Sequence, residues 1–366
     1  MRRGALVPLV LMACAAALGA PLEAATNAST STNASTAVAV RTEDPQGTFR
    51  RDVQVSRVVV DAHVVDSSGD PIPGLGAADF EVLVDGKRAE VESVEWVPAG
   101  QSEFTPRTPA PGEPEGAQPV APAGAPSGRV IVFFFQTDLQ PLRLTGFMKM
   151  IQHARSLLDT LLPADRVAVV SFDSHLKLRQ DFTGDRKKLE AAIFEAVKVG
   201  STDEVAVSPA PSIARGFDFV AARKAATVEK GLALTAKALA PIPGAKTLLF
   251  FGWGLHVNRH PGESTDYGEA LAALKAARLS VFSIDVTDAD FHTLEGELEL
   301  IADLTGGTYH KTHIFPASAL ERVARQISGR YVVVVIAPPG KRGRHDLELK
   351  LVGRKGRILS RNTFDD

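Results

Sequence analysis

Strand-like apolar runs alternate with helical patterns from about residue 128 to residue 328. A strand that helices cover on both faces is typically apolar throughout, because neither face meets water. Four runs fit this description: Arg129–Phe135, Arg166–Phe172, Thr247–Phe251 and Leu279–Val286. Strands joined by helices predict a mostly parallel sheet with right-handed crossovers. We therefore expect an α/β domain of the Rossmann-like, doubly wound type at residues 128–328.

The helices of this domain are predicted from apolar residues that recur every three to four positions. The first helical stripe runs from Leu144 to Leu161. The other patterns lie at Asp185–Val199, Ser212–Leu239, Glu269–Arg278, Leu294–Leu304 and Ala317–Ile327. The Ser212–Leu239 pattern contains Gly231, and glycine weakens a helix interior, so we expect a break near that residue.

On either side of this domain the period of the apolar residues changes to two, as in half-buried strands. Residues 51–98 contain Val58, Val60 and Val64 in alternation, and residues 329–366 contain a similar pattern after Tyr331. A change of phase between Val91 and Trp96 predicts a β-bulge. Neither segment has enough strands for a core of its own. We expect them to pair in one small β-sandwich into which the α/β domain is inserted.

Two further segments have the composition of linkers. Residues 99–127 are rich in proline, glycine and alanine, which predicts an extended linker. Residues 26–50 repeat the sequence Thr-Asn-Ala-Ser-Thr and lack large apolar side chains, so we expect a low-complexity tether.

The first 25 residues have the features of a secretory signal peptide: Arg2 and Arg3, then an apolar stretch, then small residues. We therefore expect an exported protein, in the periplasm, the cell envelope or the medium. The single cysteine, Cys14, lies in a near-lipobox and is either removed with the signal or lipidated, and only lipidation would place the protein on a membrane. The net charge of −2 across 366 residues does not suggest a nucleic acid as partner.

Motifs of catalysis are sparse. Ser174 and Lys177 have the spacing of a serine acyl-enzyme, but they follow a strand rather than begin a helix, so we favour coincidence. His256 and His260 would suit a metal on a helix, whereas Pro261 predicts a loop and a solvated pair.

A set of short motifs, each weak alone, is specific in its order and spacing. The set comprises Gly74-Leu75, Asp79–Val82, Asp85–Lys87, Asp165–Val167, Ser171-Phe172, Phe182-Thr183, Ala302–Gly307 and Tyr331. With these motifs the chain from about Val53 to Phe364 resembles the von Willebrand factor type A (VWA) family, most closely its secreted bacterial branch described as acidobacterial VWFA-related.

This resemblance implies a metal-ion-dependent adhesion site, with an Asp-x-Ser-x-Ser motif after the first strand, a loop threonine and an aspartate after the fourth strand. In this sequence the aspartate and the two serines of the motif correspond to Gln136, Asp138 and Gln140. The loop threonine corresponds to Thr202, and Trp253 stands in place of the last aspartate. Mg²⁺ prefers oxygen ligands with carboxylate charge. An indole has no oxygen and a carboxamide has no charge, so we expect a degenerate site without a metal.

Three hypotheses about function follow. We favour a non-enzymatic, exported protein that binds another protein at the degenerate edge formed by these five residues, without a cofactor. The first alternative is a ligand binder that uses Mg²⁺ or Mn²⁺ in a rearranged site of Asp138, Thr202 and Asp203. The second alternative is an enzyme that uses the crevice at the top of the sheet, around Asp138, Thr202, Asp203 and Asp285. The position of Trp253 should distinguish a binding protein from an enzyme. An indole that fills the crevice favours a protein-binding surface, whereas an open pocket with converging carboxylates favours an active site.

Overall fold

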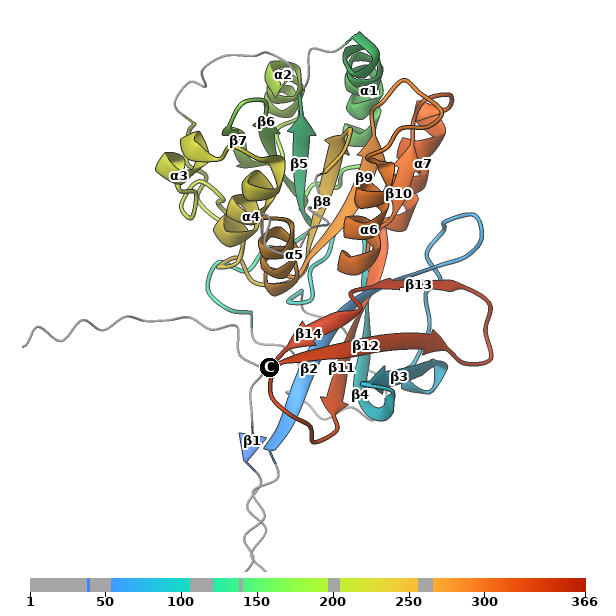
Figure 1. Cartoon of the computed structure of the whole chain (residues 1–366). Helices are drawn as coiled ribbons and strands as arrows, with labels where there is room; N and C mark the ends of the chain where they lie inside the picture. Colours follow the sequence, from blue (N-terminus) through green and yellow to red (C-terminus); the bar gives the residue numbers. More distant parts are fainter. Residues whose placement is uncertain (1–37, 40–53, 106–120, 138–140, 197–204, 256–265) are drawn as a thin grey trace, which may run out of the picture. The chain divides into compact units, whose positions relative to one another are not determined.

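Six strands form the central sheet of the α/β domain: β5 (Val130–Gln136), β6 (Arg166–Phe172), β7 (Leu176–Thr183), β8 (Lys246–Gly252), β9 (Leu279–Asp285) and β10 (Tyr309–Lys311). Their order is β10-β9-β8-β5-β6-β7, and only β7 is antiparallel to its neighbour (Figure 1). Counted within the domain, this is the doubly wound order 3-2-1-4-5-6. The winding direction reverses between β5 and β8, which confirms the predicted mixed α/β class.

This computed structural model describes residues 38–39, 54–105, 121–137, 141–196, 205–255 and 266–366. No described helix combines the length and the apolar character that a membrane span requires.

Helices cover both faces of the central sheet, which explains why β5 is buried at every position (Figure 1). Phe133 and Phe135 pack with α1 (Pro141–Leu158), α2 (Arg186–Ala196) and α7 (Pro316–Gln326). On the opposite face Phe134 packs with a second group of helices. These are α3 (Phe219–Lys224), α4 (Val228–Leu239), α5 (Asp266–Ala276) and α6 (Glu295–Thr305).

The predicted break at Gly231 is wrong. The helical pattern divides at residues 225–227 instead, where the Thr227 hydroxyl caps α4 by accepting from the Lys230 N–H at 3.2 Å. Gly231 lies inside α4, and a Cβ there would meet the Phe172 ring at 3.0 Å. The glycine therefore allows close packing of helix on sheet and does not end the helix.

Strands from the two ends of the chain pair in a second sheet, as the period of two predicts. Its strands are β1 (Val38–Ala39), β2 (Gln54–Val65), β3 (Phe80–Val84), β4 (Lys87–Pro98), β11 (Gly329–Ala337), β12 (Arg344–Leu351), β13 (Arg357–Ser360) and β14 (Thr363–Asp365). A short 3₁₀ helix, η1 (Ala77–Asp79), precedes β3. β11 lies between β2 and β4, and the bulge predicted in β4 is present opposite Val334 and Val335. Hydrogen-bonded pairing links all eight strands in one sheet. The sequence predicts a β-sandwich of two layers here, and that arrangement stays a prediction.

Tyr331 organises the core of this second sheet. Its side chain is fully buried, and its ring lies 4.8 Å from that of Trp96 and 5.6 Å from that of Phe80. The hydroxyl donates to the Ile72 carbonyl at 2.8 Å and accepts from the Leu75 N–H at 3.0 Å. A buried tyrosine needs such partners, so Tyr331 fixes the loop before η1 as well as the strands.

Charged side chains connect the second sheet to the α/β domain. Arg278, between α5 and β9, donates to Asp61 of β2 at 2.7 and 2.9 Å and to Glu103 at 2.7 and 2.9 Å. Arg330 of β11 donates to Glu103 at 3.0 Å. Burial raises the pKa of Asp61, but the Arg278 guanidinium and then Arg330 outweigh it, and the pKa falls to about 2.

Glu103 belongs to the segment that the sequence predicts to be an extended linker. Its described part is packed instead: Ser102 is buried, and the Thr105 hydroxyl donates to the Ser127 carbonyl at 3.2 Å. The first residues of this segment therefore hold the two sheets together. The other predicted boundaries, including the signal peptide and the tether, stay predictions.

Gly146 provides a first test of the packing. A Cβ at Gly146 would lie 1.5 Å from the Val286 carbonyl oxygen, so α1 would have to move away from the end of β9. We expect Gly146→Ala to lower the free energy of unfolding by about 1–3 kcal/mol in urea denaturation, despite the higher helix propensity of alanine. Gly268→Ala in α5 is the control, because nothing lies within 4 Å of its Cβ. That variant should gain up to about 1 kcal/mol. Equal stability of both variants would contradict this packing.

Arg278 provides a second test. Arg278→Ala leaves two largely buried carboxylates short of their main partner, and we expect a loss of about 3–5 kcal/mol in the free energy of unfolding. The control is Arg354→Ala, which removes an exposed pair with Asp79 and should cost less than about 1 kcal/mol. Because the pKa of Asp61 is lowered from 3.8 to about 2 on folding, its contribution is present above about pH 4 and is lost as the pH falls toward 2. Comparable losses in both variants would contradict the structural role of Arg278.

Candidate functional site at the carboxyl edge of the sheet

The carboxyl ends of β5 and β8 meet where the winding of the sheet reverses, which is where doubly wound folds bind ligands. Gln136 ends β5 and is 2% exposed. Its Oε1 accepts from the backbone N–H of Trp253 at 3.0 Å and of Gly254 at 3.3 Å. The carboxamide therefore bridges the two strand ends. Gly252 makes room for it, since a Cβ at that position would lie 2.8 Å from Oε1.

Trp253 covers the same edge. Its side chain is half-buried and packs on the cluster that contains Phe133 and Phe251. The guanidinium carbon of Arg143, in the first turn of α1, lies 3.6 Å from the centroid of the indole. This is a cation–π contact. The indole stands where the VWA resemblance assigns an aspartate, and the loss of a metal site there stays a prediction.

The structure brings Gln136 and Trp253 together, as the sequence predicts. The other candidates, Asp138, Gln140 and Thr202, lie outside the described residues, and so do Asp203, His256 and His260. Their roles in the site stay predictions.

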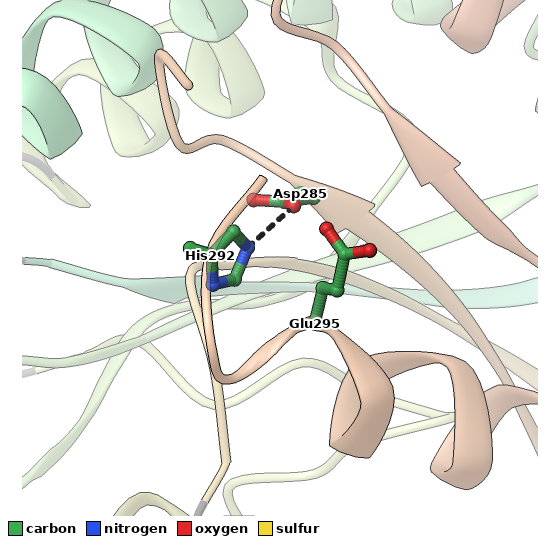
Figure 2. Close-up of side chains that lie close together, drawn as sticks. All are labelled: Asp285, His292 and Glu295. Atoms are coloured by element: carbon green, nitrogen blue, oxygen red, sulfur yellow. Dashed lines mark hydrogen bonds and ion pairs between the residues drawn. The ribbon is translucent and has the colours of Figure 1, made fainter. Parts of the chain in front are cut away.

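A second polar cluster lies at the carboxyl end of β9 (Figure 2). Ligand atoms of Asp285, His292 and Glu295 lie within 4.8 Å of one another. Asp285 is buried, and its Oδ2 accepts from His292 Nε2 at 2.7 Å and from the Tyr309 hydroxyl at 2.8 Å. The sequence identified Asp285 but not its partners, because His292 and Glu295 match no spaced metal motif.

The cluster has the ligand types of a metal site, but its hydrogen bonds suit a proton network better. The Leu294 N–H points to His292 Nδ1 at 3.3 Å, which leaves the imidazole proton on Nε2, the nitrogen that a metal would need. Lys311 Nζ lies 2.8 Å from Glu295 Oε2, and this contact raises the pKa of Lys311. Burial, and next the Asp285 carboxylate, raise the pKa of Tyr309, so its hydroxyl stays a donor.

Ser174 and Lys177 do not form the arrangement of a serine acyl-enzyme. Lys177 is buried and pairs with Asp173. The Ser174 hydroxyl lies 3.1 Å from Asp173 Oδ1 and 3.0 Å from His175 Nδ1. The lysine therefore neutralises an acid in the β6–β7 turn.

A groove of about 910 Å³ lies between α1 and α2. Leu144, Met148, Ile151 and Phe194 line it, and Lys149, Arg155 and Lys187 are also part of its wall. It offers apolar surface without a group of side chains suited to acid–base chemistry.

Comparison with known proteins gives a likeness of fold. No family model and no curated protein matches the chain. Among solved structures it matches a von Willebrand factor type A protein from Catenulispora acidiphila, at 14% identity and a TM-score of 0.40 over 80% of this chain and 75% of the other.

Two more solved structures match at similar levels. The ArnB paralog VWA2 from Sulfolobus acidocaldarius matches at 9% identity and a TM-score of 0.37, over 84% of this chain and 75% of its own. Proximal thread matrix protein 1 of the mussel byssus, with zinc in its metal-ion-dependent adhesion motif, matches at 13% identity and 0.38, over 57% and 48%. The VWA resemblance inferred from the motifs is thus found again among solved structures. At these TM-scores it says nothing of what this chain binds.

The second cluster can be tested with zinc. Because Nε2 of His292 carries a proton and Lys311 contacts Glu295, we expect no saturable heat when zinc chloride is titrated into the wild-type protein at neutral pH. Lys311→Met removes the cation from Glu295 and should make zinc binding measurable. Lys149→Met is the control, since Lys149 pairs with Asp288 outside the cluster. Saturable binding by the wild type that His292→Gln abolishes would instead assign a metal to this cluster.

Proposed function

We propose that this chain is an exported, non-enzymatic interaction protein, and that it binds a protein partner through the loops at the carboxyl edge of its VWA-like domain without a metal ion. The N-terminal sequence supports export, and the β-rich second sheet would serve as the base that carries the domain. If Cys14 is lipidated, the base would be attached to a membrane.

The observation that carries this proposal is an apolar surface on two neighbouring loops, after β9 and β10. Phe291 is 72% exposed, Ile314 65% and Phe315 72%. Large apolar side chains cost free energy when they remain in water, and a group of them on one surface marks an interaction site. Aromatic anchors of this kind contribute most of the binding energy in many interfaces.

Polar contacts hold the two loops together. Lys311 Nζ donates to the Asp290 carbonyl at 2.8 Å, and His313 Nδ1 lies 3.0 Å from Asp288 Oδ1. Lys149 of α1 donates to the same Asp288 oxygen at 3.0 Å. Because these contacts order the loops beforehand, a partner would lose less conformational entropy on binding them.

Cross-linking with matched variants tests this proposal. The full-length protein, with a photoreactive residue at Thr293, should form a discrete adduct with an envelope protein. The double variant Phe291→Ser/Phe315→Ser should lower the yield of that adduct at least about tenfold, as the loss of anchors worth 1 kcal/mol or more each predicts.

Val220→Ser in α3 is the control, because it removes an apolar side chain that is also exposed, at 56%, but is not on these loops. Its adduct yield should equal that of the wild type. An adduct that survives the double variant, or that both variants lose equally, would contradict binding through this surface.

A further inference from the structure

We propose that β14 is a strap on the second sheet, and that its attachment to β12 weakens as the imidazole of His345 loses a proton. β14 is the end strand of this sheet and pairs with β12. The ladder consists of three residue pairs, with His345 opposite Phe364 at its centre. A short strand at the edge of a sheet opens more readily than the strands inside it, so single side-chain contacts matter for its attachment.

His345 lies between two carboxylates and is buried, with 6% of its surface exposed. Its Nδ1 lies 2.7 Å from Oδ2 of Asp85, in the turn between β3 and β4. Its Nε2 is also buried and lies 3.3 Å from Oδ1 of Asp366, after β14. A neutral imidazole has one N–H and one lone pair, whereas an imidazolium has two N–H donors. Only the charged form therefore directs an N–H toward both acids.

Backbone hydrogen bonds hold the two carboxylates in place. Oδ1 of Asp85 accepts from the Asp346 N–H at 2.9 Å. Oδ1 of Asp366 accepts from the Gly343 N–H at 2.8 Å, and the Asp366 N–H donates to the Gly343 carbonyl at 3.1 Å. Because both acids are fixed, one of them faces a nitrogen lone pair when His345 is neutral. That repulsion acts directly on the connection between β12 and β14.

The ring of His345 also packs on the strap itself. It stacks on Phe364 of β14, with 5.0 Å between the ring centroids and 25° between the planes. Phe364 is 5% exposed and belongs to the same apolar core as Tyr331. A movement of the imidazole away from a carboxylate therefore disturbs the packing of the side chain that anchors β14.

Two other charged side chains lie on the paired strands. Arg344 of β12 and Asp365 of β14 are opposite each other, but both are exposed and their charged atoms are 3.6 Å apart. An exposed pair of this kind contributes little. The attachment that depends on charge is therefore concentrated at His345.

Lys275 of α5 contacts the beginning of the strap. Its Nζ donates to Asn362 Oδ1 at 3.0 Å and to Thr363 Oγ1 at 2.5 Å. Burial, and next Arg344 and Arg361, lower the pKa of Lys275 to about 8. A neutral amine still has two N–H donors for these two oxygens, so we expect this contact to survive the loss of the lysine proton.

The direction of the pH effect follows from the contacts of His345. The hydrogen bond with Asp85 raises the pKa of His345 against the effect of burial, and Asp366 raises it further. The same contact lowers the pKa of Asp85, so that acid stays charged. Because the ordinary histidine pKa is about 6.5, the stabilisation by the imidazolium is complete below about pH 6.5. It is lost as the pH rises through the raised pKa of the folded state.

Amide hydrogen exchange of the full chain, followed by NMR, tests the strap. The reporters are the N–H groups of Leu347 and Asp366, which donate to the Asn362 carbonyl at 2.8 Å and to the Gly343 carbonyl at 3.1 Å. After correction for intrinsic exchange, their protection should fall at least about tenfold between about pH 6 and pH 9, as the loss of a charge-assisted hydrogen bond predicts. The Ile72 N–H, which donates to the Val64 carbonyl at 2.8 Å beside the same sheet, is the control and should keep its protection.

Two substitutions connect this change to the imidazole. His345→Gln cannot titrate, so the protection of the reporters should be equal at both pH values. Asp85→Asn keeps an acceptor for the Asp346 N–H but removes the charge, so the His345 ring signals should titrate at lower pH and the loss of protection should move with them. Asp346→Asn is the matched control, because it removes the same charge from the adjacent exposed side chain. It should leave the titration nearly unchanged.

The titration of His345 in the wild-type protein provides a result that does not depend on any variant. A ring that titrates at or below about pH 6.5 would overturn the proposal. Reporter protection that is independent of pH would do the same. A pH dependence that persists in His345→Gln would assign the opening of β14 to another group, and Lys275→Met would then identify it. Urea denaturation at about pH 6 would show that each variant is folded.

Discussion

The carboxamide of Gln136 joins the ends of two parallel strands at the point where the winding of the sheet reverses. Strands β5 and β8 are hydrogen-bonded along their length, and the amide extends that connection into the loop beyond β8. A carboxylate at this position would need a cation or several donors beside it. A neutral amide needs neither, and its Oε1 accepts both backbone hydrogen bonds of the loop. The position of the backbone at Trp253 and Gly254 depends on this neutral acceptor.

The two ends of the central strands are stabilised by different interactions. Phe135 stacks on Phe251 at 4.5 Å beneath the edge, so the strand ends are supported by a close-packed apolar layer. At the opposite end of the strands, charged groups make the contact with the second sheet. Asp61, Glu103, Arg278 and Arg330 form a network in which each charge has an opposite neighbour. His63 lies beside it, and burial lowers its pKa to about 4, so the imidazole is neutral near pH 7 and donates to the Gly329 carbonyl. Such a network is costly to break but adds little over apolar packing.

Most polar groups of the described carboxyl edge are engaged in contacts within the chain. Asp285, His292, Tyr309 and Lys311 are engaged with one another or with Glu295, which stabilises the loops after β9 and β10. Phe291, Ile314 and Phe315 are exposed on the surface of those loops. The buried donor of Gln136 is different, because its partner is not found among the described residues.

The α/β class, the position of the buried strands and the pairing of the two β-rich ends were predictable from the amino-acid sequence, because the periods of apolar residues reflect which faces are covered. It also placed Gln136 and Trp253 at the same edge of the sheet, since each follows directly on a buried strand. Which side chains contact one another could be seen only in the folded chain. The helix divides at Thr227 rather than at Gly231, because space beside Phe172 and not backbone propensity determines where that glycine is needed. Glu103 was assigned to a linker by composition, yet it is held by two arginines that are 175 and 227 residues away along the chain. His292, Glu295 and Arg143 had no local signal either, because their roles come from contacts between loops and helices that follow different strands.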